Sequence, residues 1–259
     1  RLPKIVVPVH FAGQACDMRL IHALSQRYGF RIVEDASHAI GSRYLGEPVG
    51  NGRYSDITVF SFHPVKIITT AEGGMALTQD EGLAARMQRL RSHGITRDTA
   101  LLGRPDEGAW YYEQVELGWN YRMTDVQAAL GESQLSRLAA YVERRHEIAQ
   151  RYDRLLSGLP VVTPWQSFDA HSALHLYPVQ VAATERRRVF DRLRAADIGV
   201  NVHYIPVHLQ PDYRRLGFEP GQFPEAELYY GRALSLPIYA TLTDEQQDRV
   251  VEELAEALG

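Results

Sequence analysis

The chain has a single cysteine, Cys16, so it lacks the pair that an internal disulfide needs, which fits a reducing compartment. No apolar run approaches the length of a membrane span, and no stretch has the pattern of a secretory signal peptide. No sign of charge dominates, since the formal net charge is -4. A nucleic-acid or anionic-membrane partner is therefore not expected. These absences together fit a cytoplasmic protein.

The composition is that of an ordinary globular protein, with 45% hydrophobic and 23% charged residues among 259. This length suffices for one large domain or for a medium and a small one. The sequence begins with Arg1 rather than Met, and residues 5–9 (IVVPV) already have the pattern of a buried strand. We therefore expect that a sheet is entered partway and that this chain is part of a longer protein or a processed product.

The first half of the sequence alternates strand and helix patterns. Apolar residues at helical spacing predict helices, and short β-branched runs predict strands. The expected strands are residues 5–9, 31–34, 57–62 and 75–78, and the expected helices are residues 17–28 and 81–92. This alternation predicts an α/β domain with a mainly parallel sheet.

The second half has a different pattern, because residues 96–118 read as a long loop and strands and helices follow with less regularity. Capping-box patterns begin at Thr124 and Thr243. The first predicts a long helix that runs to about Leu156 and bridges two domains. We expect residues 1–140 to form part of a large domain, and residues 141–259 to form the bridging helix and a smaller α+β domain. Its expected elements are strands 175–181 and 199–204, a helix at 184–196, and a closing helix to Leu258.

Lys66 follows a strand pattern and is preceded by Ser61 and His63. Burial of an amine lowers its pKa and leaves a nucleophile that can attack a carbonyl, as a Schiff-base lysine must. The alternative is a surface lysine in a loop. Ser61 is a candidate to donate a hydrogen bond to a phosphate, and His63 is equally a candidate to orient the lysine, contact a substrate or fill space.

Asp35 stands at the carboxyl end of the preceding predicted strand, where ligands of open α/β sheets bind. A carboxylate there can hold a proton on a heterocyclic nitrogen, although it can also simply begin a turn or cap a helix. Because Asp35 and Lys66 end two strands of one sheet, we expect their side chains to converge. His38, three residues after Asp35, is a candidate for the same ligand or a polar residue beneath a loop.

Several other motifs allow both a structural and a functional interpretation. Gly73 and Gly74 permit a close backbone approach or a turn. Asn120 and Arg122 precede a helix and could serve an anionic ligand or belong to a plain loop. His203 and His208 are not joined by a cysteine or carboxylate cluster, so we expect no metal site. The run from Glu185 to Arg188 is expected to be a solvated helix face.

Six motifs, taken together, resemble those of the DegT/DnrJ/EryC1/StrS sugar aminotransferases. They occur in the family's order and span nearly the whole chain: residues 34–41 (EDASHAIG), 60–66 (FSFHPVK), 72–74 (EGG), 91–94 (RSHG), 120–129 (NYRMTDVQAA) and 202–208 (VHYIPVH). The resemblance implies the type I fold of aminotransferases that use pyridoxal 5'-phosphate, here N-terminally incomplete. It also implies an upstream segment that cups the phosphate and stacks an aromatic residue on the ring.

The resemblance assigns roles by position. Lys66 would carry the cofactor covalently and move a proton between carbon centres. Asp35 would pair with the ring nitrogen, His38 would lie near the ring oxygen, and Ser61 would bind the phosphate. The remaining assignments concern the substrate: Asn120 would reach the active site of a neighbouring subunit in a homodimer, and His63, His203, Tyr204 and Ile205 would lie by the nucleotide sugar.

The implied reaction transfers the amino group of glutamate to C4 of a UDP-linked 4-keto-6-deoxy amino sugar. Within the family, the amino-acid sequence of residues 61–72 and 203–210 is most similar to that of enzymes of pseudaminic acid biosynthesis. The related dehydratases carry histidine in place of Lys66, which favours transamination. The alternatives are another nucleotide keto-sugar, such as a perosamine or 4-amino-arabinose precursor, or a truncated non-catalytic chain.

Overall fold

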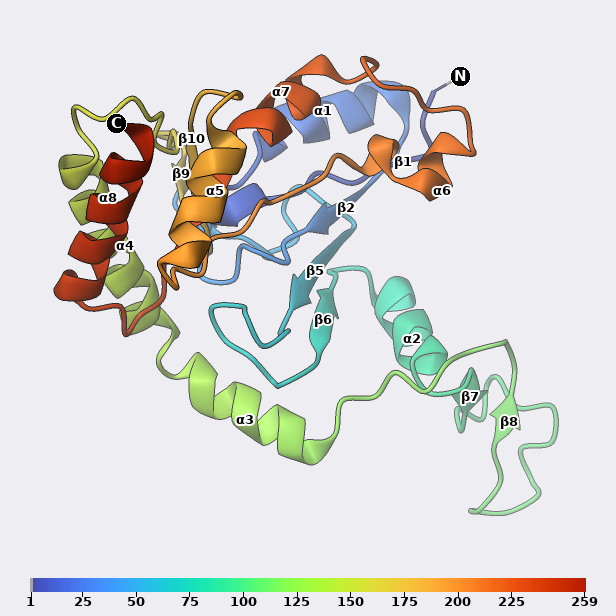
Figure 1. Cartoon of the computed structure of the whole chain (residues 1–259). Helices are drawn as coiled ribbons and strands as arrows, with labels where there is room; N and C mark the ends of the chain where they lie inside the picture. The colour runs from blue at the N-terminus through green and yellow to red at the C-terminus, as the bar shows by residue number, and fades with distance from the viewer. Residues whose placement is uncertain (1) are drawn as a thin grey trace. The chain divides into compact units, whose positions relative to one another are not determined.

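The computed structural model describes residues 2–259 and divides them into two compact units (Figure 1). Arg1, on which part of the expectation about the start of the chain rests, lies outside the described residues. The first unit consists of the described residues up to Val9, with Cys16–Ser37 and Val49–Ser136, and the second of His10–Ala15, His38–Pro48 and Arg137–Gly259.

The first unit contains a four-stranded sheet with the order β1-β2-β5-β6. Its strands are β1 (Ile5–Val6), β2 (Arg31–Asp35), β5 (Ile57–Ser61) and β6 (Gly74–Leu77). β1 and β5 both run parallel to β2, and β6 is antiparallel to β5. The predicted, mainly parallel α/β sheet is therefore confirmed. Asp35 is paired with Val59, so β2 ends two residues before β5 does.

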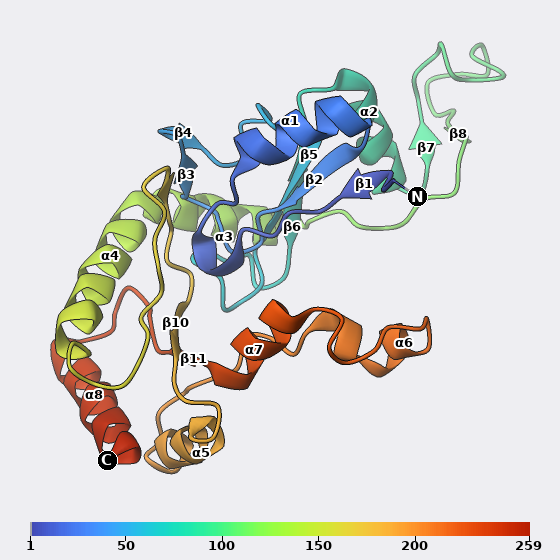
Figure 2. The same ribbon diagram turned by 90° about the horizontal axis from the view of Figure 1, so that it is seen from above.

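α1 and α2, two helices of the first unit, begin within one residue of where the sequence predicts, because their N-caps are local. α1 (Met18–Tyr28) begins at Asp17, whose carboxylate accepts from the Leu20 N–H, and ends at Gly29 in the left-handed conformation. α2 (Glu81–Leu90) begins at Asp80 in the same way. Figure 2 shows α1 lying next to β2 and β1.

The prediction of a buried strand at residues 5–9 is wrong in its burial. Only Ile5 and Val6 form a strand, and Val9 adds an isolated bridge to Asp35. Ile5, Val7 and Val9 are exposed. Apolar β-branched residues favour a strand, but a strand is buried only where another layer packs against it. In the described part of the first unit these side chains remain accessible.

The long bridging helix is also corrected, because it is two helices. α3 (Asp125–Leu135) begins at the predicted capping box, in which Thr124 and Gln127 bond reciprocally. It ends at Ser136, whose hydroxyl donates to the Ser133 carbonyl, a local bond that competes with continuing the helix. α4 (Leu138–Leu155) then follows. The break coincides with the division between the two units.

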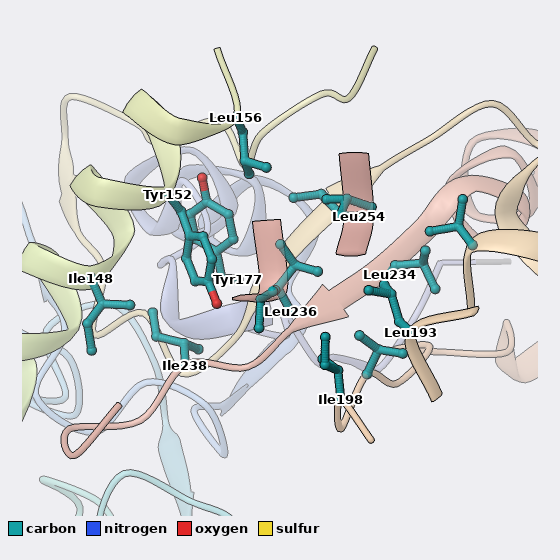
Figure 3. Packing of buried hydrophobic residues seen from close by; sticks show 14 of the residues in the cluster. Ile148, Tyr152, Leu156, Tyr177, Leu193, Ile198, Leu234, Leu236, Ile238 and Leu254 are labelled. Atoms are coloured by element: carbon teal, nitrogen blue, oxygen red, sulfur yellow. The ribbon is translucent and has the colours of Figure 1, made fainter. Parts of the chain in front are cut away.

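The second unit has its hydrophobic core between helices and a two-stranded antiparallel sheet, β10 (Tyr177–Gln180) with β11 (Ala233–Leu236). Figure 3 shows Tyr152 stacked on Tyr177 beside Leu236 and Ile238. The helices that contribute are α4, α5 (Arg186–Ala195) and α8 (Asp244–Leu258). The second predicted capping box, at Thr243, is present and begins α8.

Short elements complete both units. β3 (Arg43–Tyr44) pairs with β4 (Glu47–Pro48) across a two-residue turn, in which Leu45 and Gly46 both have positive φ. β3 also pairs with β9 (Ala170–His171). The others are η1 (Phe11–Gly13), β7 (Ile95–Thr96) paired with β8 (Glu113–Gln114), η2 (Val207–Leu209), α6 (Pro211–Arg214) and α7 (Pro224–Arg232).

The prediction of a strand at residues 199–204 is wrong. Asn201 makes one isolated bridge to Ser235, and the chain then leaves the sheet. The Asn201 side chain accepts from the next backbone N–H, of Val202, which replaces a ladder bond with a local one. Across residues 2–259 no helix combines the length and apolar character needed to cross a membrane.

Candidate active site

Asp35 and Ser61 are the last residues of β2 and β5, two adjacent parallel strands. Both are partly buried. Asp35 Oδ1 accepts from the Ser37 N–H at 3.0 Å, which forms a turn directly after the strand rather than a turn of helix. Ser61 Oγ accepts from the His63 N–H at 3.3 Å. The parallel pairing brings a carboxylate and a hydroxyl to one edge of the sheet, as expected.

Lys66 lies in a turn beyond β5, so the expectation that it ends the strand is corrected. Its N–H donates to the His63 carbonyl at 2.9 Å. Burial lowers the pKa of the Lys66 amine, and the Asp35 carboxylate opposes part of that shift. The Asp35 carboxylate therefore acts electrostatically on the Lys66 amine. An amine with a lowered pKa is more often in the neutral, nucleophilic form.

The segment from Phe62 to Gly74 is held in place by a dense set of hydrogen bonds. Phe62 donates to the Gly73 carbonyl at 2.8 Å, and its own carbonyl accepts from the Thr70 N–H at 3.0 Å and the Thr69 hydroxyl at 2.8 Å. Ile67 and Ile68, next to the lysine, are buried. The segment that carries Lys66 is thus anchored on both sides of it.

Two glutamines of α3 also anchor this segment, and sequence reasoning missed them. Gln134 Oε1 accepts from the Thr69 N–H at 3.0 Å, and Gln127 Nε2 donates to the Glu72 carbonyl at 3.0 Å. Gly131 lies between them, where a Cβ would come within 2.7 Å of Thr70. The only signal in the sequence is their spacing of seven residues, which places both on one helix face.

Gly73 and Gly74 are needed for close approach, one of the two uses expected of them. A Cβ on Gly74 would lie 2.8 Å from the Phe60 carbonyl oxygen, and one on Gly73 would lie 2.3 Å from Thr70 Oγ1. His63 is exposed, with its Nε2 3.9 Å from Glu72 Oε1. Its ring points toward this carboxylate, so the structure offers no support for the interpretation that His63 orients Lys66.

Asn120 lies elsewhere in the first unit, beside the C-terminal end of α2. The flanking Trp119 N–H donates to the Leu90 carbonyl at 2.7 Å, and the Tyr121 N–H donates to the Arg91 carbonyl at 2.8 Å. Asn120 itself makes a bridge to Ser92 and remains exposed. Two motifs that are far apart in the sequence, residues 91–94 and 120–129, therefore lie side by side. The backbone on either side of the exposed Asn120 is held in place by these hydrogen bonds.

His38 belongs to the second unit and is buried. Its Nδ1 accepts from the Ala12 N–H at 3.3 Å, and its Nε2 is 3.2 Å from the Tyr204 hydroxyl. Because Nδ1 acts as an acceptor, the ring proton belongs on Nε2, which can donate to Tyr204. Phe11 and His175 pack against the ring, with centroids 6.0 Å and 4.4 Å away.

His203, Tyr204 and Ile205 follow the point at which the chain leaves the sheet of the second unit. His203 Nδ1 is 2.8 Å from Ser235 Oγ of β11, which orients the ring. Tyr204 is 52% exposed and Ile205 47% exposed. The structure therefore joins His38 to Tyr204 through a hydrogen bond, and it leaves an aromatic and an apolar side chain accessible next to a fixed histidine.

The chemistry of the Asp35, Ser61 and Lys66 set fits pyridoxal phosphate. The half-buried amine with a lowered pKa suits covalent attachment, the carboxylate suits a proton on a ring nitrogen, and the hydroxyl suits a phosphate oxygen. In the part of the chain that the structure describes, no three histidine, cysteine or carboxylate side chains gather in a way that could hold a metal ion.

The chain is similar to curated proteins over nearly its whole length. It is 41% identical over 256 residues to the spore coat polysaccharide biosynthesis protein SpsC of Bacillus subtilis, which covers 96% of this chain and 65% of that protein. The chain spans about 65% of the length of the curated relatives it matches.

Two solved structures have the same fold. The putative sugar aminotransferase Spr1654 of Streptococcus pneumoniae, solved in its PLP form, has a TM-score of 0.87 at 32% identity over 98% of this chain and 68% of that one. Helicobacter pylori PseC, an aminotransferase involved in the biosynthesis of pseudoaminic acid, has a TM-score of 0.88 at 30% identity over 97% and 66%.

These neighbours confirm the fold expected from the motifs. The family model for DegT/DnrJ/EryC1/StrS aminotransferases matches residues 2–255, nearly the whole sequence. The chain belongs to the DegT/DnrJ/EryC1/StrS aminotransferase family.

Proposed function

We propose that this protein is part of a pyridoxal phosphate-dependent aminotransferase that acts on a nucleotide sugar. The observation that carries the proposal is the half-buried Lys66 amine, whose pKa is lowered by burial and which lies close to Asp35 at the edge of a parallel sheet. A solvated structural lysine needs neither feature. Family membership supplies the reaction class, and the geometry of this chain supplies the group that would perform it.

The residues then have distinct tasks. Pyridoxal phosphate, when bound, supplies an electron sink for the carbon that carries the amino group. The Lys66 amine would hold the cofactor and, when free, remove and return the proton at that carbon. Asp35 would keep a proton on the ring nitrogen. Ser61 would donate to the phosphate, and His38 would lie near the ring oxygen.

We further propose that the amino donor is glutamate and the acceptor is a UDP-linked 4-keto-6-deoxy amino sugar, aminated at C4, as in pseudaminic acid biosynthesis. The support is the motif of residues 203–208 and the likeness to PseC. Tyr204 and Ile205 offer an exposed aromatic and apolar surface that suits a base or sugar face, and His203 offers an oriented ring nitrogen. His63 would serve the substrate from its exposed position.

The protein is also proposed to work as a homodimer in the cytoplasm, with Asn120 serving the partner's site. The segment around Asn120 has large apolar side chains that are unusually accessible, among them Leu117 at 81% and Val126 at 82%. Trp110, Trp119 and Tyr121 are exposed on the same segment. An accumulation of exposed aromatic and aliphatic side chains is typical of a protein interface.

The decisive experiment measures cofactor attachment directly. Purified protein incubated with pyridoxal phosphate should acquire a visible absorbance band, and mass spectrometry after borohydride reduction should locate the added mass on Lys66. Lys66→Arg keeps a cation but should lose both signals. A wild-type protein that remains without the band and the added mass would refute the proposal and favour a non-catalytic chain.

Two further measurements test the finer assignments. A panel of UDP- and dTDP-linked keto-sugars, each assayed with glutamate, identifies the acceptor, and turnover of a perosamine or 4-amino-arabinose precursor alone would overturn the pseudaminic acid assignment. Mixing inactive Lys66→Ala chains with inactive Asn120→Ala chains should restore part of the activity if the site is shared between subunits. No restoration in a verified mixed dimer would contradict sharing.

A further inference from the structure

The segment from Val202 to Arg232 is an excursion from the sheet of the second unit. The chain leaves after the bridge of Asn201 to Ser235 and returns at Ala233, the start of β11. Figure 2 shows α7 and α6 extending away from the pair β10 and β11. Within this described segment only Pro206 and His208 are buried. Its conformation therefore depends on a few specific contacts rather than on a core of its own.

One of these contacts is an ion-pair-type hydrogen bond between the two ends of the excursion. His208 Nε2 lies 2.8 Å from Glu227 Oε1, so η2 near the start is tied to α7 near the end. The imidazole side chain is 8% exposed and the carboxylate side chain 24%. A charge-assisted bond that is largely shielded from solvent is stronger than a surface pair.

The same carboxylate also holds the loop between α6 and α7. Glu227 Oε1 accepts from the Gly221 N–H at 2.7 Å. The hydrogen bond from His208 is the first cause that lowers the pKa of Glu227, and the bond from Gly221 is the second. The carboxylate is therefore the common acceptor of two donors from separate parts of the excursion.

Aromatic packing covers this junction. The Phe223 ring lies against the His208 ring with centroids 4.7 Å apart, and Phe218 lies 6.2 Å from Phe223. The Phe223 ring shields the imidazole on one side, while its Nε2 faces the carboxylate. We name the set of His208, Gly221, Phe223 and Glu227 the Glu227 junction.

The short stretch 204–207 is thereby fixed at both ends. His203 is bonded to Ser235 Oγ at one end, and His208 is bonded to Glu227 at the other. Between them Tyr204, Ile205 and Val207 are exposed. Exposed apolar and aromatic side chains on a stretch that is fixed at both ends form a pre-organised contact surface. Binding to such a surface loses less conformational entropy than binding to a flexible one.

We propose that the Glu227 junction is a positioning device, which holds the stretch 204–207 in the shape that receives the nucleotide part of the acceptor. His208 and Glu227 act through Tyr204 and Ile205 and do not touch the ligand. This inference rests on the proposed function, because it assigns the ligand class to the exposed stretch. Beyond the proposed function, the inference identifies His208 and Glu227 as the residues that set the shape of the stretch 204–207.

The test uses UDP as the probe and compares Glu227→Ala with Glu227→Gln. Glutamine keeps the acceptor oxygen, whereas alanine leaves the largely buried His208 donor without it. Hydrogen exchange of the unliganded protein should become faster in Glu227→Ala at the amides of Gly221 and Leu209. Glu225→Ala, in the exposed first turn of the same helix, is the matched control and should leave exchange unchanged.

Calorimetry then measures UDP binding by the same variants. The dissociation constant should rise about tenfold in Glu227→Ala, the factor that loss of one such bond commonly produces, and much less in Glu227→Gln. The absorbance of bound pyridoxal phosphate should be unchanged in every variant. This last readout separates the junction from the cofactor site.

Each of the other possible outcomes overturns one defined part of the proposal. Unchanged hydrogen exchange in Glu227→Ala means that the junction does not hold the excursion. Faster exchange with unchanged UDP affinity means that the junction is structural only. Wild-type protein that does not bind UDP overturns the ligand class, whereas an absent cofactor band, with UDP binding and its dependence on Glu227 intact, refutes the proposed catalysis and leaves the junction standing.

Discussion

Arg145 is a buried cation that has no carboxylate partner among the described residues, and replacing it tests how the second unit is held together. Its Nη1 donates to three backbone carbonyls: Leu174 at 2.9 Å, His175 at 3.2 Å and Ile238 at 3.0 Å. In the described chain its Nε has no hydrogen-bond partner. One side chain on α4 thus binds both the entry to β10 and the segment after β11.

Two opposing terms decide the effect of Arg145→Met. Burial lowers the pKa of Arg145 from its ordinary value to about 10. At about 1.4 kcal/mol per pKa unit, this corresponds to a desolvation cost of about 3 kcal/mol, which methionine removes. Against it, methionine leaves three carbonyls without their donor; at about 1.5 kcal/mol each, within the range of about 1–3 kcal/mol for a buried group left unpaired, the loss is about 4.5 kcal/mol. The losses exceed the gain by about 1–2 kcal/mol.

The lowered pKa of Arg145 determines whether its contribution to stability rises or falls with pH. Below about pH 10 the folded and unfolded chains both carry the charge, so the full desolvation cost is present at neutral pH. Above about pH 10 the unfolded chain binds more protons than the folded one, so the contribution of this residue to stability rises with pH. The comparison of the variants therefore belongs at neutral pH.

Urea unfolding at pH 7, followed by circular dichroism, measures the difference. We expect Arg145→Met to lower the free energy of unfolding by about 1–2 kcal/mol with an unchanged m-value. Arg154→Met, an exposed arginine of the same helix, is the control and should change it by less than about 0.5 kcal/mol. An Arg145→Met protein as stable as the wild type, or more stable, would show that desolvation outweighs the three carbonyl bonds.

Two further predictions concern the first unit. Gly94→Ala should destabilise it strongly, by about 2 kcal/mol or more, because Gly94 has positive φ and a Cβ would lie 1.8 Å from the Glu116 carbonyl oxygen; a melting temperature within error of the wild type would contradict this. Asp35→Asn removes the carboxylate that raises the pKa of Lys66, so that pKa should fall further. The pH profile of Lys66 trinitrophenylation in cofactor-free protein should shift its midpoint to lower pH, and a shift to higher pH would refute the pairing.

Features that depend on neighbouring residues could be predicted from the sequence. Asp17, Thr124 and Thr243 each bond a backbone N–H three residues ahead, so the start of their helices is determined within one turn. The sequence predicted β2 and β5 as strands of a mainly parallel sheet, and their parallel pairing brings Asp35 and Ser61 to one edge. For this reason the centre of the candidate site could be located without the structure.

The predictions that failed depend on residues distant in sequence. The exposure of Ile5 and Val9 depends on whether another layer covers β1, and the loss of the strand at 199–204 depends on competition at Asn201. The support of the Lys66 segment by Gln127 and Gln134 joins residues more than fifty positions apart. No local pattern specifies which side chain of a helix will meet a given loop.

The sequence by itself determined the family, the caps, and the chemical groups available at the sheet edge, because motifs and local hydrogen bonds are properties of short segments. Only the tertiary structure decided which of these groups are buried and which partners they have. Lys66 has a lowered pKa because of the packing around it, and Arg145 and His208 have their partners because distant segments converge on them. Burial and electrostatic environment are set by what surrounds a residue in space, and that surrounding exists only after the chain has folded.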